Sequence, residues 1–124
     1  MKDYALWFRR MVLLGVAVNL LLAIPGVFVP NTVIALVGGT AVANAVWPAF
    51  ASLLIILLSL FYVVAAFDPF RYLPVAWLTV AARFAGVCFF LVLHPQYLLF
   101  AFIDLFFGLS QGVLLLLALR QPRL

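Results

Sequence analysis

The chain has 124 residues, of which 70% are hydrophobic and 8% are charged, and its formal net charge is +4. A soluble domain carries roughly a quarter charged residues, so this composition excludes an ordinary water-exposed fold and predicts one membrane-embedded domain, residues 1–124. The basic balance does not indicate nucleic-acid binding, because no basic stripe with interleaved aromatic residues occurs; basic residues flanking membrane spans explain it better. The single Cys88 allows neither an intrachain disulfide nor a redox pair.

Four apolar runs are long enough to cross a bilayer as helices. They cover about residues 11–29, 47–67, 73–93 and 97–119, and they predict an all-α membrane four-helix bundle. A cleaved signal peptide is the alternative for the first run, since Ala41, Val42 and Ala43 have the small-x-small form of a cleavage site. The first run exceeds the usual apolar length of a signal peptide, so we expect it to remain as a helix.

The connection between the first two runs is apolar but interrupted by proline, glycine and asparagine. Asn31 is expected to cap a short interfacial helix over residues 32–37, which Gly38 and Gly39 would end. We expect this segment to lie in the outer interface and to cover the bundle. A re-entrant loop is the alternative, and it would need protein around its free backbone groups.

Basic residues predict the orientation of the four spans. They lie ahead of the first span (Lys2, Arg9 and Arg10), between the second and third (Arg71), and after the fourth (Arg120 and Arg123). The first and third connections carry no lysine or arginine. The positive-inside rule therefore predicts that both termini are cytoplasmic. Between the second and third spans, Asp68 followed by Pro69 is expected to cap a turn into the third helix, with a proton site as the alternative.

Two charged residues inside the apolar runs predict a buried pair. Arg83 lies ~15 Å deep in its run, and Asp104 ~13 Å deep in the next, at ~1.5 Å of rise per residue. Asn19 falls near the same level, Gln111 shares the face of Asp104, and Ser52, Ser59 and Tyr62 share one face of the second run. A charge at the bilayer centre costs ~2.5–3.5 kcal/mol on insertion scales, so pairing alone accounts for both residues.

Two interpretations of the cluster Arg83, Asp104, Asn19 and Gln111 remain open. In the first, the cluster fixes helix register or supports docking of a partner. In the second, it is a ligand, proton or ion site, because ionisable residues inside a membrane are functional candidates. Arg83 would then favour an anionic or carbonyl-bearing ligand. Four aromatic residues could wall an apolar one: Phe84, Phe89, Phe106 and Phe107.

Catalytic patterns are nearly absent from the sequence. The only histidine, His94, lies at the third connection, so one chain cannot supply two histidines to a haem. No spacing of histidine, cysteine and acidic residues is typical of a metal site, and no serine has a base nearby in the sequence. We therefore expect no catalytic residue, no cofactor and no bound metal.

Short motifs along the whole chain resemble one family. Phe8, Arg9 and Arg10 precede a span with a central Asn19, and a Pro-Asn segment that ends in Gly-Gly follows. Asp68-Pro69 comes after the second span, a basic residue lies in the third span and an acidic one in the fourth. This pattern resembles the DoxX-like group of small bacterial membrane proteins. The resemblance implies a four-helix bundle in the inner membrane, and some relatives are subunits of quinone-linked oxidoreductases. The paired cysteines of redox-active relatives are missing here, which argues against a thiol-redox role.

These observations lead to two functional hypotheses. The first is a non-catalytic accessory or anchoring subunit of a membrane complex, in contact with lipid and partner subunits, with a lipid, quinone or small apolar molecule as its ligand. The alternative is a small-molecule or proton-coupled carrier that uses the Arg83–Asp104 pair. A membrane enzyme would need chemistry from a partner or a bound cofactor.

Overall fold

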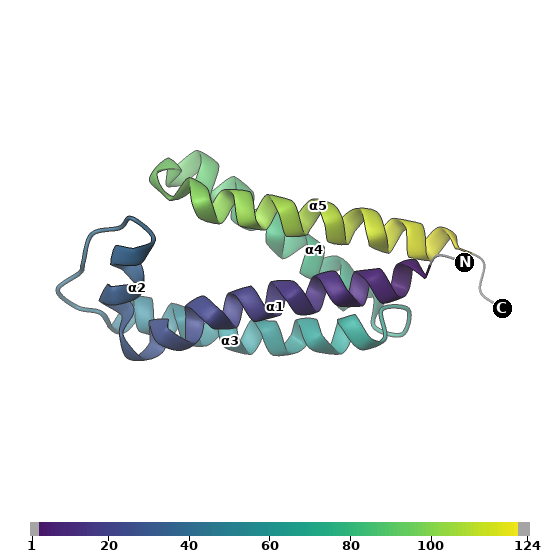
Figure 1. Cartoon of the computed structure of the whole chain (residues 1–124), viewed down its shortest axis with the longest axis horizontal. Helices are drawn as coiled ribbons and strands as arrows, with labels where there is room; N and C mark the ends of the chain where they lie inside the picture. The colour runs from purple at the N-terminus through teal and green to yellow at the C-terminus, as the bar shows by residue number, and fades with distance from the viewer. Residues whose placement is uncertain (1–2, 122–124) are drawn as a thin grey trace.

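The computed structural model describes residues 3–121, apart from the side chain of Gln96, and this part of the chain is helical with no strand. Its helices are α1 (Tyr4–Phe28), α2 (Pro30–Leu36), α3 (Val46–Phe67), α4 (Leu73–Cys88), the π-helical continuation η1 (Phe89–Leu93), the 3₁₀ turn η2 (Pro95–Tyr97) and α5 (Leu98–Arg120) (Figure 1). Four helices are long and apolar enough to cross a membrane: α1, α3, α4 with η1, and α5. The prediction of an all-α four-helix bundle is confirmed, and the chain is a multi-pass membrane protein.

The long helices form two antiparallel pairs. Helix α1 packs along α3, and α4 packs along α5; α1 and α5 then join the pairs, whereas α3 and α4 touch much less. Figure 1 shows the pairs close together at the end that carries both termini and diverging toward the end that carries α2. The apolar core lies where the pairs meet. Its buried members are Phe8, Val12, Val16, Tyr62, Ala65, Ala66, Ala76, Val80 and Leu115.

Helix α1 begins seven residues before the apolar run from which it was predicted. Asp3 caps it, since the backbone N–H of Leu6 donates to the Asp3 carboxylate at 3.1 Å. Phe8 is fully buried, so the first turns belong to the core rather than to a polar head. Arg9 donates from Nη2 to the carbonyl of Phe67 at 3.0 Å and thereby satisfies a free carbonyl at the end of α3.

The short helix of the first connection is present, but the expected capping role of Asn31 is wrong. Pro30 occupies the first turn of α2, where its missing N–H costs nothing. Asn31 instead bridges to Val42: its Nδ2 donates to the Val42 carbonyl at 3.0 Å, and its Oδ1 accepts from the Val42 N–H at 2.9 Å. The other end is as predicted, because Gly38 has a φ of 88° and the N–H of Gly39 donates to the carbonyl of Ile34 at 2.8 Å.

Both termini and the connection between α3 and α4 lie at the same end of the bundle (Figure 1). That end carries the described arginines other than Arg83, namely Arg9, Arg10, Arg71 and Arg120. Lys2 and Arg123, which entered the prediction of orientation, lie outside the described residues. Asp68 is exposed in this connection, and its Oδ1 accepts from the N–H of Arg71 at 3.2 Å, so it caps the turn that leads into α4.

Candidate functional site

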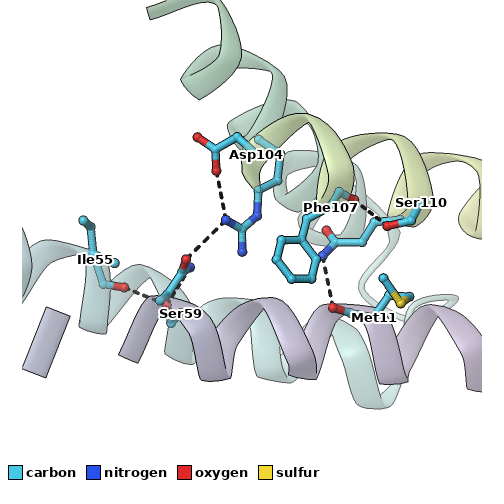
Figure 2. Close-up of polar contacts among 9 residues, drawn as sticks. Met11, Ile55, Ser59, Asp104, Phe107 and Ser110 are labelled. Atoms are coloured by element: carbon cyan, nitrogen blue, oxygen red, sulfur yellow. Dashed lines mark hydrogen bonds and ion pairs between the residues drawn. The ribbon is translucent and has the colours of Figure 1, made fainter. Parts of the chain in front are cut away.

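A chain of hydrogen bonds joins all four long helices near their middle (Figure 2). Arg83 of α4 donates from Nη1 to Asp104 Oδ1 of α5 at 3.0 Å and to Asn19 Oδ1 of α1 at 3.2 Å. Asn19 donates from Nδ2 to Ser59 Oγ of α3 at 3.2 Å, and the Ser59 hydroxyl donates to the carbonyl of Ile55 at 2.8 Å. Each bond pairs a donor with an acceptor, so this polar network (Arg83, Asp104, Asn19 and Ser59) holds four helices in one register.

Glycines provide the space that the polar network occupies. A Cβ atom at Gly86 would overlap the carboxylate of Asp104, and one at Gly15 would lie 2.7 Å from Nη2 of Arg83. At Gly108 it would lie 3.1 Å from Cβ of Arg83. Because each glycine is on a different helix, the backbones of α1, α4 and α5 can all approach the charged pair closely.

The guanidinium group of Arg83 has two distinct sides. Both hydrogens of Nη1 are used, one for Asp104 and one for Asn19. Nε and Nη2 are buried and have no hydrogen-bond partner among the described residues. On the packed half of the bundle, Gly15 lies against Nη2 and the ring of Phe107 lies 5.0 Å from the guanidinium carbon. A cation over an aromatic face is stabilised electrostatically, and this contact partly replaces the missing hydrogen bonds.

Gln111 belongs to the packed half and not to the polar network. It is fully buried, and its Nε2 donates to the carbonyl of Met11 at 3.3 Å, which ties α5 to α1. Its Oε1 is buried without a partner among the described residues. Gln111 was predicted to belong to one cluster with the pair, but among the described residues it forms no hydrogen bond with Arg83 or Asp104, and it lies two turns of helix from Asp104.

A cavity of about 240 Å³ lies on the other side of Arg83, between the diverging helix pairs. The polar groups on its wall come from Asn19, Ser52, Arg83 and Asp104. The remaining lining residues are apolar: Val18, Leu22, Ala23, Val33, Ile55, Phe90, Phe100 and Ile103. The polar network thus separates a packed half of the bundle from a hollow half.

Asp104 presents one free oxygen on the hollow side. Its Oδ1 accepts from Arg83, whereas Oδ2 has no partner in the described part of the chain and, unlike the orphaned nitrogens of Arg83, stays accessible. Oδ2 lies against Gly86, one turn beyond Arg83 toward the hollow end. The Asp104 side chain is 18% exposed and the Arg83 side chain 6%.

The aromatic residues expected to wall the cavity are the wrong ones. Phe90 of η1 and Phe100 of α5 line it, with ring centroids 5.3 Å apart. Phe107 lies under Arg83 on the packed side, and Phe84, Phe89 and Phe106 are exposed on the outside of the bundle. The sequence shows how many aromatic residues each helix carries but not how the helix is rotated about its axis. Because neighbouring residues differ by ~100° around that axis, the rotation decides which rings face the cavity.

Ser59 is the member of the polar network that the initial cluster omitted. A signal for it existed, because Ser52, Ser59 and Tyr62 share one face of the second run. All three face the interior: Ser59 joins the polar network, Tyr62 is in the core, and Ser52 lines the cavity and touches Gly26. Polar residues that share one face of a transmembrane helix therefore indicate which side chains belong to an interior polar network.

Within residues 3–121 no three histidine, cysteine or acidic residues are close enough to hold a metal ion, and Cys88 is exposed. Comparisons with family models, with curated proteins and with solved structures find no match to this chain. Fold and site together define its class: a multi-pass four-helix membrane protein with a charged pair and a cavity inside the bundle.

Proposed function

We propose that this protein binds a small amphipathic molecule inside the bundle and catalyses no reaction by itself. The observation that carries the proposal is the cavity beside the Arg83–Asp104 pair. Protein interiors are close-packed, and a charged pair that served register alone would be enclosed by side chains. A concave, mostly apolar pocket with a few convergent polar groups is typical of a ligand site.

A second candidate function is that of an accessory subunit in a membrane complex. It is favoured by an apolar groove between α3 and α4, which is lined by Leu58, Phe61, Tyr62, Val75, Leu78, Ala81, Ala82 and Ala85. Small residues such as Ala81 and Ala85, one turn apart, allow another transmembrane helix to approach closely. The resemblance to DoxX-like proteins, some of which are subunits of quinone-linked oxidoreductases, supports the same role. The two candidate functions are compatible, since a subunit can hold a ligand.

Purification in a mild detergent, with mass spectrometry of retained proteins and small molecules, tests both candidates. Val18 lines the cavity, so Val18→Phe should fill part of it and release a bound molecule. Leu21 is one turn away and 74% exposed, so Leu21→Phe is the matched control and should retain the molecule. Equal retention by both variants would contradict the ligand site. A stoichiometric partner protein would support the subunit, and purification as a lone chain would count against it.

We further propose that the protein resides in a bacterial inner membrane with both termini in the cytoplasm. The arginines at the terminal end support this orientation. In a Cys88→Ala background, a membrane-impermeant maleimide added to intact cells should label Asn44→Cys in the first connection and leave Gln121→Cys unlabelled. The reverse pattern would overturn the orientation.

A further inference from the structure

We infer that the ligand of this cavity is a neutral molecule about the size of one substituted ring, and that its hydroxyl group donates a hydrogen bond to Asp104 Oδ2. The inference rests on the proposed ligand-binding function and specifies its chemistry. It departs from the expectation that Arg83 selects an anionic or carbonyl-bearing ligand.

Arg83 has no hydrogen-bond donor available to a molecule in the cavity. The two hydrogens of Nη1 are held by Asp104 and Asn19, at 3.0 and 3.2 Å. The other nitrogens, Nε and Nη2, are buried; Gly15 lies against Nη2, and the ring of Phe107 lies 5.0 Å from the guanidinium carbon. A carboxylate or carbonyl in the cavity would therefore gain no bond from the guanidinium unless the polar network broke.

The free polar group of the charged pair is instead an acceptor. Asp104 Oδ2 packs against Gly86, has no partner among the described residues and is not one of the buried unpartnered atoms, so it stays accessible. A carboxylate oxygen only accepts hydrogen bonds, and its bonds to a hydroxyl are among the stronger ones in proteins. The chemistry that complements the free oxygen is an O–H group.

Charge balance favours a neutral donor over an ion of either sign. Arg83 and Asp104 are in contact, so together they place no net charge on the cavity wall. An anion would face the carboxylate, and a cation would add charge next to the guanidinium. Either would bring an uncompensated charge into a low-dielectric interior, which is costly. A neutral hydroxyl avoids this cost.

The cavity sets the size and character of the rest of the molecule. An apolar protein cavity of about 150 Å³ is large enough to bind benzene. The 240 Å³ here leaves room for one ring with a short substituent. The rings of Phe90 and Phe100 and the side chains of Leu22 and Ile103 form an apolar wall for that ring.

A matched ligand series on the purified protein in lipid nanodiscs tests the inference. The probes are 4-propylphenol, its isostere 4-propyltoluene, 4-propylbenzoate and 4-propylbenzylammonium, titrated by calorimetry with empty nanodiscs subtracted. We expect the phenol to bind about tenfold more tightly than the toluene, because a hydrogen bond to a charged group is lost in the isostere. Both charged probes should bind more weakly than the phenol. Val18→Phe should abolish phenol binding and Leu21→Phe should preserve it.

The outcomes separate this inference from the proposed function. If the toluene binds the wild type as tightly as the phenol and no longer binds Val18→Phe, the cavity takes ligands but the inferred need for a hydroxyl donor is wrong. If the benzoate or the ammonium binds more tightly than the other probes, the inferred preference for a neutral hydroxyl donor is wrong in the same way. If none of the four probes binds beyond the empty-nanodisc signal, or if Val18→Phe binds them as the wild type does, the ligand site itself is refuted. The comparison of phenol with toluene needs no variant, so it holds even if Val18→Phe fails to fold.

Discussion

The charged pair gives the sharpest test of how the bundle is stabilised. Arg83→Met and Asp104→Leu each remove one partner, and the double variant removes both. The Arg83 side chain is 6% exposed, so Asp104→Leu leaves a buried guanidinium whose remaining hydrogen bond is to Asn19. Breaking a buried ion pair from one side costs about 3–5 kcal/mol, and we expect a loss of about 4 kcal/mol in the free energy of unfolding.

The opposite single variant should be milder. A carboxyl group can become neutral by binding a proton, whereas a guanidinium stays charged. Asp104 is also the more exposed partner, at 18%. We therefore expect Arg83→Met to cost about 2 kcal/mol, and the double variant to cost no more than that, because neither charge is then left alone.

Reversible unfolding in mixed micelles, followed by circular dichroism, measures all four proteins in one cycle. The reasoning predicts a coupling energy of at least about 4 kcal/mol and a larger loss for Asp104→Leu than for Arg83→Met. Additive losses within about 0.5 kcal/mol would show that the two charges do not depend on each other. Equal losses from the single variants would refute the assigned difference between the partners.

Three further substitutions test individual contacts. Gly86→Ala should displace the carboxylate of the buried pair and lower the free energy of unfolding by about 2 kcal/mol in a thermal or detergent melt. Gly112→Ala is the control, because its new Cβ would lie 3.3 Å from the nearest side-chain atom, and it should change stability by less than about 1 kcal/mol. Equal effects of the two variants would contradict the overlap of Gly86 with the carboxylate. Asn31→Ala removes both hydrogen bonds to Val42, so proteolysis of residues 30–45 should accelerate while the melting temperature stays nearly constant. An unchanged rate of cleavage would argue against the two hydrogen bonds between Asn31 and Val42. Asp3→Ala should cost about 1 kcal/mol and raise hydrogen exchange in the first turn of α1, whereas Asp3→Asn should retain the cap; equal exchange in both would refute it.

The four spans could be predicted because they depend on composition and length alone. A bilayer requires about twenty apolar residues per helix, and that requirement is visible without any tertiary contact. The pairing of Arg83 with Asp104 was also accessible, since helical rise places both at a similar depth and a lone charge there is costly. These features follow from the membrane, which acts on every residue in the same way.

Other features depend on contacts between segments and could not be read from the chain. Helix α1 extends back to Tyr4 because Phe8 packs in the core, which only the packed helices define. The π-helical turn Phe89–Leu93 has no local signal in the sequence. Asparagine often caps helices, but Asn31 instead bonds both the carbonyl and the N–H of Val42. These two bonds form only when the connection between α1 and α3 is folded.

The position of the cavity explains why the structural and functional interpretations of the charged pair need not exclude each other. On the packed side, Gly15 lies against Nη2 of Arg83 and the ring of Phe107 packs on the guanidinium group, so that side contributes to stability. On the hollow side, the helix pairs diverge and Asp104 Oδ2 is left without a partner. A variant that acts only on the hollow side, such as Val18→Phe, should therefore change ligand binding at nearly constant stability. Gly15→Ala, which acts on the packed side, should instead lower the stability of the bundle.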